Sequence, residues 1–274
     1  MKKQAILGFC FVVALVSCKK ELINKVQFQN PVLSYDLAIE GGVNSLELTQ
    51  FIKISKPAFR ISDHVLPIND AQVFINDVEL KIANSDGLYS TNLIDSKRYN
   101  TIYRLKIIYK GNTYNAEDTL KKVEAIDPKE GNIRKEKTDE KTFFSIPKHV
   151  FNATKAAKLF YQLPGQQPWS PAFFGASAYR SFIHTSAPPY GLSPVLEKRT
   201  NYEFMQTDSI TVYKFSVSTG YEKFLYEAFQ ETDWKSLFSS TPGSIKGNIS
   251  GNALGYFSCS DGISEKLSLK ALTK

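Results

Sequence analysis

Apolar and polar positions alternate with a period of two between Val32 and Leu120. Alternation of this kind is typical of strands that bury one face. Gly, Pro, Asn and Asp residues separate the alternating runs, and Asn76-Asp77 between two of them predicts a tight hairpin turn. The runs before the first long hairpin cover residues 33–39, 46–54, 71–75 and 78–82.

The clearest hairpin lies at Thr101–Leu120, where Tyr103, Leu105, Ile107 and Tyr109 share one face. Its turn is predicted at Gly111-Asn112, since glycine and asparagine adopt positive φ more readily than other residues. About seven short strands with regular turn signals are typical of a sandwich. The chain is therefore predicted to be mainly β, with an immunoglobulin-like antiparallel sandwich at residues 27–125.

The second half of the chain is less regular. Residues 126–141 are charged and poor in apolar positions, which predicts a linker or surface loop. Residues 142–274 are expected to form a β-rich C-terminal domain, in which Ser209–Val217 has the β-branched and aromatic content of a strand. Alanines at helical spacing predict a short helix over residues 152–161.

One amphipathic helix is predicted at about residues 219–238. Thr219 and Glu222 have the spacing of a capping box. Apolar residues then recur at i, i+3, i+4 and i+7 from Tyr221, as on the buried face of a surface helix.

The glycine-rich segment Gly247–Gly262 reads GNISGNALGYFSCSDG. It lacks the Lys-Ser/Thr or Gly-x-Gly-x-x-Gly spacing of a phosphate-binding loop. Alternation after Ala253 predicts a late strand entered through a glycine-rich turn, with Cys259 as a small buried residue on one face of a sheet.

The N-terminus has the pattern of an export signal. Two lysines precede 12 consecutive apolar residues (5–16), a run too short for a membrane-spanning helix. The run ends in Leu15-Val16-Ser17-Cys18, which resembles the lipobox of bacterial lipoproteins. We therefore expect residues 1–17 to be a signal peptide, Cys18 to carry the lipid, and residues 18–26 to form a tether.

Charge and cysteine content bear on two questions: whether the chain binds nucleic acid and whether disulfide bonds stabilise it. Removal of the signal lowers the formal charge from +7 to +5, and the basic residues are interspersed with acidic ones, which argues against nucleic-acid binding. With Cys10 removed and Cys18 lipidated, Cys259 has no partner for an intramolecular disulfide, so the fold depends on its apolar core.

Sequence motifs for catalysis or metal binding are absent. His64, His149 and His184 are not spaced as metal ligands, and no Gly-x-Ser-x-Gly elbow occurs, so no catalytic, cofactor-binding or metal-binding residue is assigned. The candidate ligand or partner surface is a set of aromatic residues in proline-rich segments, which would otherwise fill gaps between sheets and loops. They are Trp169, Phe173, Phe174 and Tyr190.

The chain resembles the Bacteroidetes-type outer-membrane lipoproteins grouped as domain of unknown function 4249. The resemblance covers nearly the whole mature chain. The chain departs from the family pattern around residues 140–180, where the segment is short and irregular. Members of that family have no established activity. The matching features are Glu40-Gly41-Gly42, Ala71–Ile75, Gly87–Tyr89, the hairpin Tyr103–Leu120 and Asn248–Phe257.

The resemblance implies a non-enzymatic lipoprotein without a cofactor that acts as an accessory or ligand-binding partner of a TonB-dependent uptake system. The lipid would hold it to the outer membrane, on the periplasmic face or the cell surface, and its ligand is not specified. An envelope hydrolase with a site in the 160–200 loops and a structural or adhesive surface protein are the alternatives.

Overall fold

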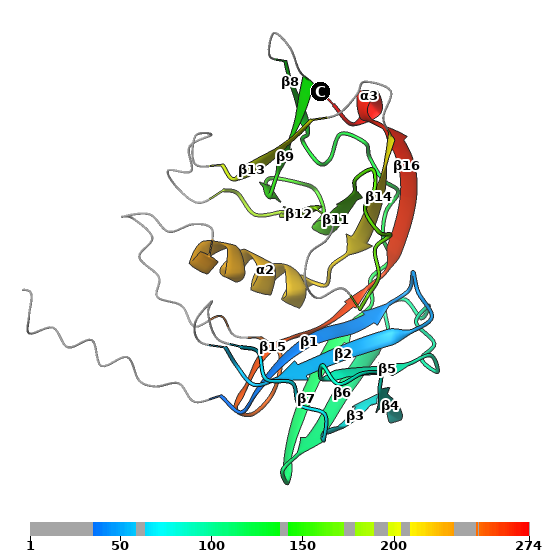
Figure 1. Cartoon of the computed structure of the whole chain (residues 1–274), viewed down its shortest axis with the longest axis vertical. Coiled ribbons are helices and arrows are strands. Elements are labelled where there is room, and N and C mark those ends of the chain that lie inside the picture. Colours follow the sequence, from blue (N-terminus) through cyan, green and yellow to red (C-terminus); the bar gives the residue numbers. More distant parts are fainter. Residues whose placement is uncertain are drawn as a thin grey trace, which may run out of the picture. The chain divides into compact units, whose positions relative to one another are not determined.

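In the part of the chain that the structure describes, strands pair into three sheets and two helices are present (Figure 1). The structure is a computed structural model that describes residues 35–58, 64–137, 142–172, 179–188, 197–203, 209–232, 245 and 247–273. The described residues contain 16 strands and belong to one compact unit, Tyr35–Lys274. The prediction of a mainly β chain is confirmed.

The first sheet has eight strands and is nearly closed into a barrel. Its two end strands, β7 and β15, approach each other: Ser250 N donates to Asn115 O at 2.7 Å, and Cys259 N donates to the Asp118 carboxylate at 2.8 Å. In spatial order the strands are β15 (Ala253–Ser260), β1 (Leu37–Asn44), β2 (Gln50–Ser55), β5 (Leu88–Thr91), β4 (Val78–Ile82), β3 (Gln72–Ile75), β6 (Ile102–Tyr109) and β7 (Asn112–Thr119).

Period-two alternation correctly predicts most of these strands, because every second side chain points into one core. Asn76 and Asp77 have φ of 46° and 66°, which confirms the predicted hairpin turn. The second turn lies one residue earlier than expected, with positive φ at Lys110 and Gly111, while Asn112 already begins β7.

The strand β15 is an addition to the module expected at residues 27–125. Strands β1–β7 pair antiparallel, as predicted, but β15 comes from the predicted C-terminal domain, pairs with β1 in the eight-stranded sheet and runs parallel to it. The two backbones come very close: a Cβ on Gly42 would lie 1.7 Å from Ser258 O, and a Cβ on Gly255 would lie 1.8 Å from Ile39 O. Local alternation carries no information about which distant strand becomes the neighbour.

A five-stranded and a three-stranded sheet share a second core, which includes Phe144, Leu159, Tyr161 and Ile210. The five-stranded sheet has the order β10 (His149–Val150), β12 (Tyr179–Ile183), β11 (Ala157–Gln162), β14 (Ser209–Ser216) and β16 (Gly262–Ser268). The three-stranded sheet has the order β13 (Arg199–Glu203), β9 (Thr142–Pro147) and β8 (Arg134–Lys137).

Two local predictions in this half are wrong. The helix expected over residues 152–161 is replaced by β11, whose neighbours on both sides override its alanine spacing. The charged segment 126–141, expected as a linker or loop, contains the exposed strand β8, which pairs with β9. The strand predicted at residues 209–217 is present as β14.

The predicted amphipathic helix is α2 (Thr219–Thr232), and residues 233–238 lie outside the described residues. Its cap lies one residue before the expected one, because Ser218 Oγ accepts from Tyr221 N at 3.1 Å. Glu222 does not close a capping box with Thr219 and instead accepts from Thr185 N at 3.0 Å. The second helix, α3 (Leu269–Leu272), is a single turn. Among the described residues, no helix is long and apolar enough to cross a membrane.

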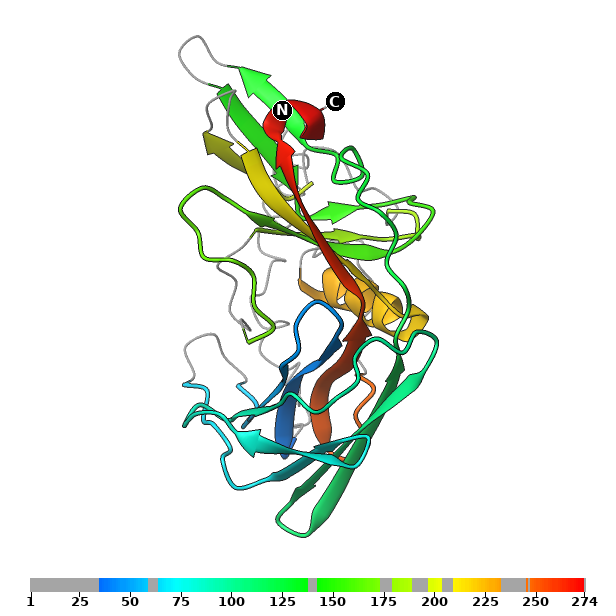
Figure 2. The ribbon, with the colours of Figure 1, turned by 90° about the vertical axis from the view of Figure 1, so that its right-hand side faces the viewer.

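The strands β15 and β16 connect the two halves of the fold (Figure 2). They are separated by Asp261 alone, so one continuous extended segment pairs first with β1 and then with β14. The buried Asp261 carboxylate accepts from Val123 N at 2.8 Å and from the hydroxyls of Ser45 and Tyr99. This residue therefore links β15–β16 to the segments that follow β1 and β7.

Candidate functional site

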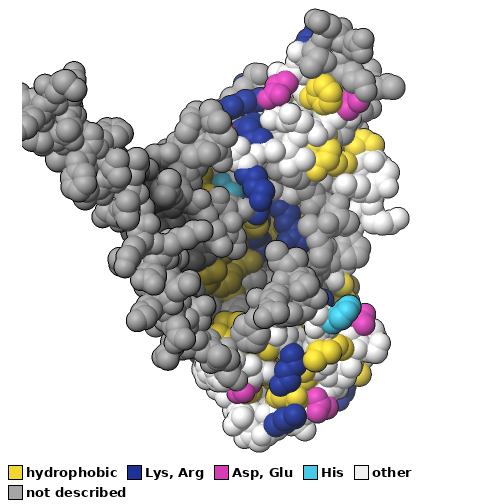
Figure 3. Space-filling view, turned by 60° about the vertical axis from the view of Figure 1, so that its left-hand side comes forward, with side chains coloured by type: hydrophobic (Ala, Val, Ile, Leu, Met, Phe, Trp, Pro, Cys, Tyr) yellow, Lys and Arg dark blue, Asp and Glu magenta, His cyan; other side chains and the backbone are white. Residues whose placement is uncertain are grey.

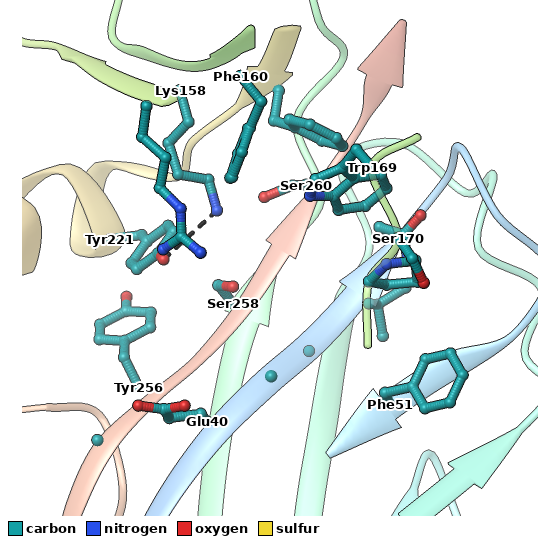
Figure 4. Close-up of a pocket in the computed structure, with 18 of the residues that line it drawn as sticks. Glu40, Phe51, Lys158, Phe160, Trp169, Ser170, Tyr221, Tyr256, Ser258 and Ser260 are labelled. Atoms are coloured by element: carbon teal, nitrogen blue, oxygen red, sulfur yellow. Dashed lines mark hydrogen bonds between the residues drawn. The ribbon is translucent and has the colours of Figure 1, made fainter. Parts of the chain in front are cut away.

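A pocket of about 310 Å³ lies between the eight-stranded sheet, the five-stranded sheet and α2. Strands β1 and β15 form its floor, β11 and β12 supply its charged wall, and α2 and the loop at Trp169–Pro171 supply aromatic and small side chains. Figure 4 shows Tyr221 and Tyr256 at one end, Trp169 at the other, and Ser258 between them.

Three residues of the floor are glycines, Gly41, Gly42 and Gly255, which leave part of its backbone uncovered by side chains. The close approach of β1 and β15 at Gly42 and Gly255 leaves no room for larger residues there. A glycine floor lets a ligand lie close to the peptide groups.

Two basic side chains, Lys158 and Arg180, line the wall. Lys158 Nζ lies 4.7 Å from the centre of the Tyr221 ring and 3.4 Å from its hydroxyl oxygen. The Arg180 guanidinium lies 5.1 Å from the centre of the Phe160 ring, because these two residues are cross-strand partners in β12 and β11. Figure 3 shows a hollowed face of the molecule where Lys and Arg side chains border hydrophobic ones.

Aromatic packing holds both ends of the pocket. Trp169 contacts the cluster of Phe160, Tyr213 and Phe215, with its ring 4.4 Å from that of Phe215. At the other end Tyr256 stacks on Tyr221 of α2 at 4.8 Å. The wall that carries the basic groups is therefore fixed by packing from three elements.

The electrostatics of the pocket favour positive charge. Burial lowers the pKa of Arg180, yet a guanidinium stays protonated at neutral pH. Burial, with the nearby Asp118 carboxylate, raises the pKa of Tyr256 to about 12, so its hydroxyl stays neutral and remains a hydrogen-bond donor. Glu40, the acidic residue on the rim, is exposed.

Polar atoms of two lining residues are buried without a hydrogen-bond partner among the described residues, namely Arg180 Nε and Ser260 Oγ. Nor does any described carboxylate form an ion pair with Lys158 or Arg180. Buried polar groups are normally satisfied, so orphaned atoms at one pocket indicate that something else completes their bonding.

Two other hollows differ in how their charged groups are paired. The larger, of about 930 Å³, also contains an orphaned buried atom, Glu130 Oε1, but Lys214 Nζ lies 2.6 Å from the other oxygen of that carboxylate, and Lys155 pairs with Glu124. The other lies on the outside of the eight-stranded sheet, where Arg104 pairs with Glu117. In both of these hollows basic side chains form ion pairs with carboxylates, whereas Lys158 and Arg180 form none among the described residues, so their pocket is the stronger candidate.

The structure also brings together two histidines that appear unrelated in the sequence. His149 Nδ1 lies 3.0 Å from His184 Nε2, because β10 and β12 are parallel neighbours. Phe229 of α2 packs on His149 at 4.4 Å, and both imidazoles are buried. Burial, and next to it the neighbouring His149, lowers the pKa of His184 to about 4, which keeps its ring neutral.

Of the residues singled out from the sequence, Trp169 lies at the pocket, where it packs against other aromatic rings. Phe173, Phe174, Tyr190 and the lipidation site Cys18 lie outside the described residues. Cys259 is fully buried in the first core, as predicted. Across the described ranges, no group of three or more His, Cys, Asp or Glu side chains could hold a metal ion.

Sequence reasoning missed the two basic residues of the pocket. Lys158 lay in a segment predicted to be helical, and Arg180 belongs to a short strand after a proline-rich stretch. The available signal was the alternation Lys158-x-Phe160 and Arg180-x-Phe182, which places a basic side chain beside an aromatic one on each strand. This alternation becomes informative only once both segments are known to be strands, because residues two positions apart share a face in a strand but not in a helix.

Comparison of the chain with protein-family models finds no match, and none of the curated proteins is significantly similar to it.

Proposed function

We propose that this protein is a non-enzymatic, lipid-anchored lipoprotein of the outer membrane that binds a small ligand between its two β-rich halves. The observation that carries the proposal is the pocket itself, in which Lys158 and Arg180 face aromatic walls without a carboxylate partner among the described residues. Its volume of about 310 Å³ lies at the lower end of the range for small-molecule sites.

Binding is favoured over hydrolysis by the chemistry of the lining residues. Ser258 and Ser260 line the pocket, but none of the three histidines does. Nucleophilic catalysis by serine needs a base within hydrogen-bond reach of the hydroxyl. The pocket offers donors, cations and aromatic faces, which serve recognition.

The anchor and the cellular role rest on the sequence. The lipobox-like end of the signal supports lipidation at Cys18, and the family resemblance supports a role as accessory to a TonB-dependent uptake system. Replacing Cys18 with alanine should release the protein from membranes or block its processing. Unchanged membrane partition of this variant would refute the anchor.

We also propose that the eight-stranded sheet derives from an immunoglobulin-like sandwich. Strands β4 and β5 are joined by two residue pairs alone, Lys81↔Ser90 and Ile82↔Tyr89, so the sheet folds over at this junction around one core. The parallel strand β15 is then an addition to that module.

Extraction of the protein from outer membranes under mild conditions tests ligand binding directly. Native mass spectrometry should find a small molecule retained by the wild type and lost from Ser258→Phe, which places a ring in the middle of the pocket (Figure 4). A TonB-dependent receptor should be enriched in the same preparation. Absence of any retained molecule would contradict the binding role, and absence of a receptor would contradict the accessory role.

A further inference from the structure

We propose that the ligand of this pocket is a small organic anion with a planar apolar body, whose anionic group lies between Lys158 and Arg180. The inference rests on the proposed ligand-binding role and specifies the chemical class of the ligand.

Neither of the two basic side chains is in direct contact with a carboxylate of the described residues, although Glu40 and Asp118 lie near enough to act electrostatically on Arg180 and Lys158 respectively. Across the described part of the chain, neither Lys158 nor Arg180 forms an ion pair, whereas the partly buried Arg199 and the buried Lys214 each pair with a glutamate. Removing a charge from water is costly unless an opposite charge or hydrogen bonds compensate it. An anion between these two groups would supply that compensation.

The hydrogen-bonding capacity points the same way. A guanidinium carries five N–H donors in a planar fork that matches a carboxylate or a phosphate. Among the described residues no acceptor bonds to Arg180, and its Nε is buried and orphaned. The neutral hydroxyl of Tyr256, beside Tyr221 and Lys158, adds a further donor on the same wall.

The rest of the pocket is shaped for a flat apolar body. Opposite the basic wall lie the glycine backbone of Gly41, Gly42 and Gly255 and, at one end, the indole of Trp169. Aromatic faces and bare peptide groups give broad, flat contact surfaces. A planar ring can lie along this floor while its anionic substituent reaches the two cations.

A matched pair of probes tests the charge requirement: indole-3-acetate, and indole-3-acetamide, which has nearly the same shape without the charge. Phenyl phosphate serves as a third probe and distinguishes a phosphate from a carboxylate head group. Binding to the full mature chain in detergent is measured by isothermal titration calorimetry. All three probes are water-soluble, which limits partition into detergent.

The acid should bind the wild type at least about tenfold more tightly than the amide, as expected for a charge-assisted hydrogen bond. Lys158→Gln and Arg180→Gln should each weaken binding of the anionic probes by about tenfold or more and leave the amide nearly unchanged. Lys110→Gln is the matched control, since Lys110 Nζ also lies over a tyrosine ring, at 5.3 Å, but away from the pocket. If Arg180→Gln does not fold, Lys158→Gln carries the test.

Equal affinity of acid and amide, or binding of the acid that is unaffected by Lys158→Gln, would overturn the anion assignment. If native mass spectrometry still finds a molecule that the wild type retains and Ser258→Phe loses, the binding role holds and the ligand belongs to another chemical class. Failure of all three probes to bind would also overturn the anion assignment, and failure to find a retained molecule as well would overturn both proposals.

Discussion

Acidification should destabilise the fold through the buried His184. This imidazole is 1% exposed, and burial together with His149 lowers its pKa from 6.5 to about 4. Between these two values the unfolded chain binds a proton that the folded protein does not, so the stability present above pH 6.5 is lost as the pH falls toward 4. Each pKa unit is worth about 1.4 kcal/mol, so the loss approaches about 3 kcal/mol.

The measurement is urea unfolding of wild type and His184→Gln across this pH range. Glutamine keeps a donor and an acceptor near His149 but does not titrate, so the variant should lose less stability on acidification, by about 3 kcal/mol. Comparison between variants is needed because burial raises the pKa values of Asp118 and Glu130, which act in the opposite direction.

His64→Gln is the matched control, since it makes the same replacement at an exposed position. Equal losses of stability in wild type and His184→Gln would refute the reasoning. The same holds if His64→Gln removes as much of the pH dependence as His184→Gln does.

Three further predictions concern the junction of the two halves. Gly255→Ala should destabilise the protein by at least about 3 kcal/mol, because φ there is +113° and a Cβ would meet the backbone of β1. Gly111→Ala, where an added Cβ would have no neighbour within 4 Å, should cost about 1–2 kcal/mol. Urea unfolding measures both variants, and equal costs would contradict the close approach of β1 and β15. Asp261→Ala should cost about 3 kcal/mol or more in the same assay, because it leaves Val123 N without its acceptor, and a cost below about 1 kcal/mol would contradict its linking role. Cys259 is buried and burial raises the pKa of its thiol, so a thiol reagent should modify it only as fast as the protein unfolds. Mass spectrometry of the peptide that contains Cys259 measures this rate. Fast labelling of the native protein would contradict the burial of Cys259.

Local patterns in the chain were enough to predict much of the first sheet. The hairpin Ile102–Thr119 alternates so regularly that both strands and their pairing follow from period two and one glycine. The same holds for Asn76-Asp77, where adjacent residues tolerate positive φ. The position of the turn between these strands was predicted less well. It lies at Lys110-Gly111, one residue before the expected Gly111-Asn112, so that lysine and not asparagine takes the other position with positive φ.

The candidate site was much harder to predict. Trp169 could be selected because a tryptophan in a proline-rich loop is unusual by itself. Lys158 and Arg180 could not, because a basic residue acquires significance only from what faces it. Their partners, the glycines of β1 and β15, lie far away in the sequence.

Residue order thus sufficed for a mainly β chain, for most strands and turns, and for the prediction of an N-terminal anchor, since each depends on neighbours within a few positions. Tertiary structure decided the parallel pairing of β1 with β15, the conversion of residues 157–162 from expected helix to strand, and the meeting of His149 with His184. It also decided the pocket, whose floor and walls come from residues 39–51, 158–180, 215–224 and 255–260. The physical reason is that burial and charge compensation act between residues adjacent in space, and one continuous strand, β15–β16, brings those distant segments together.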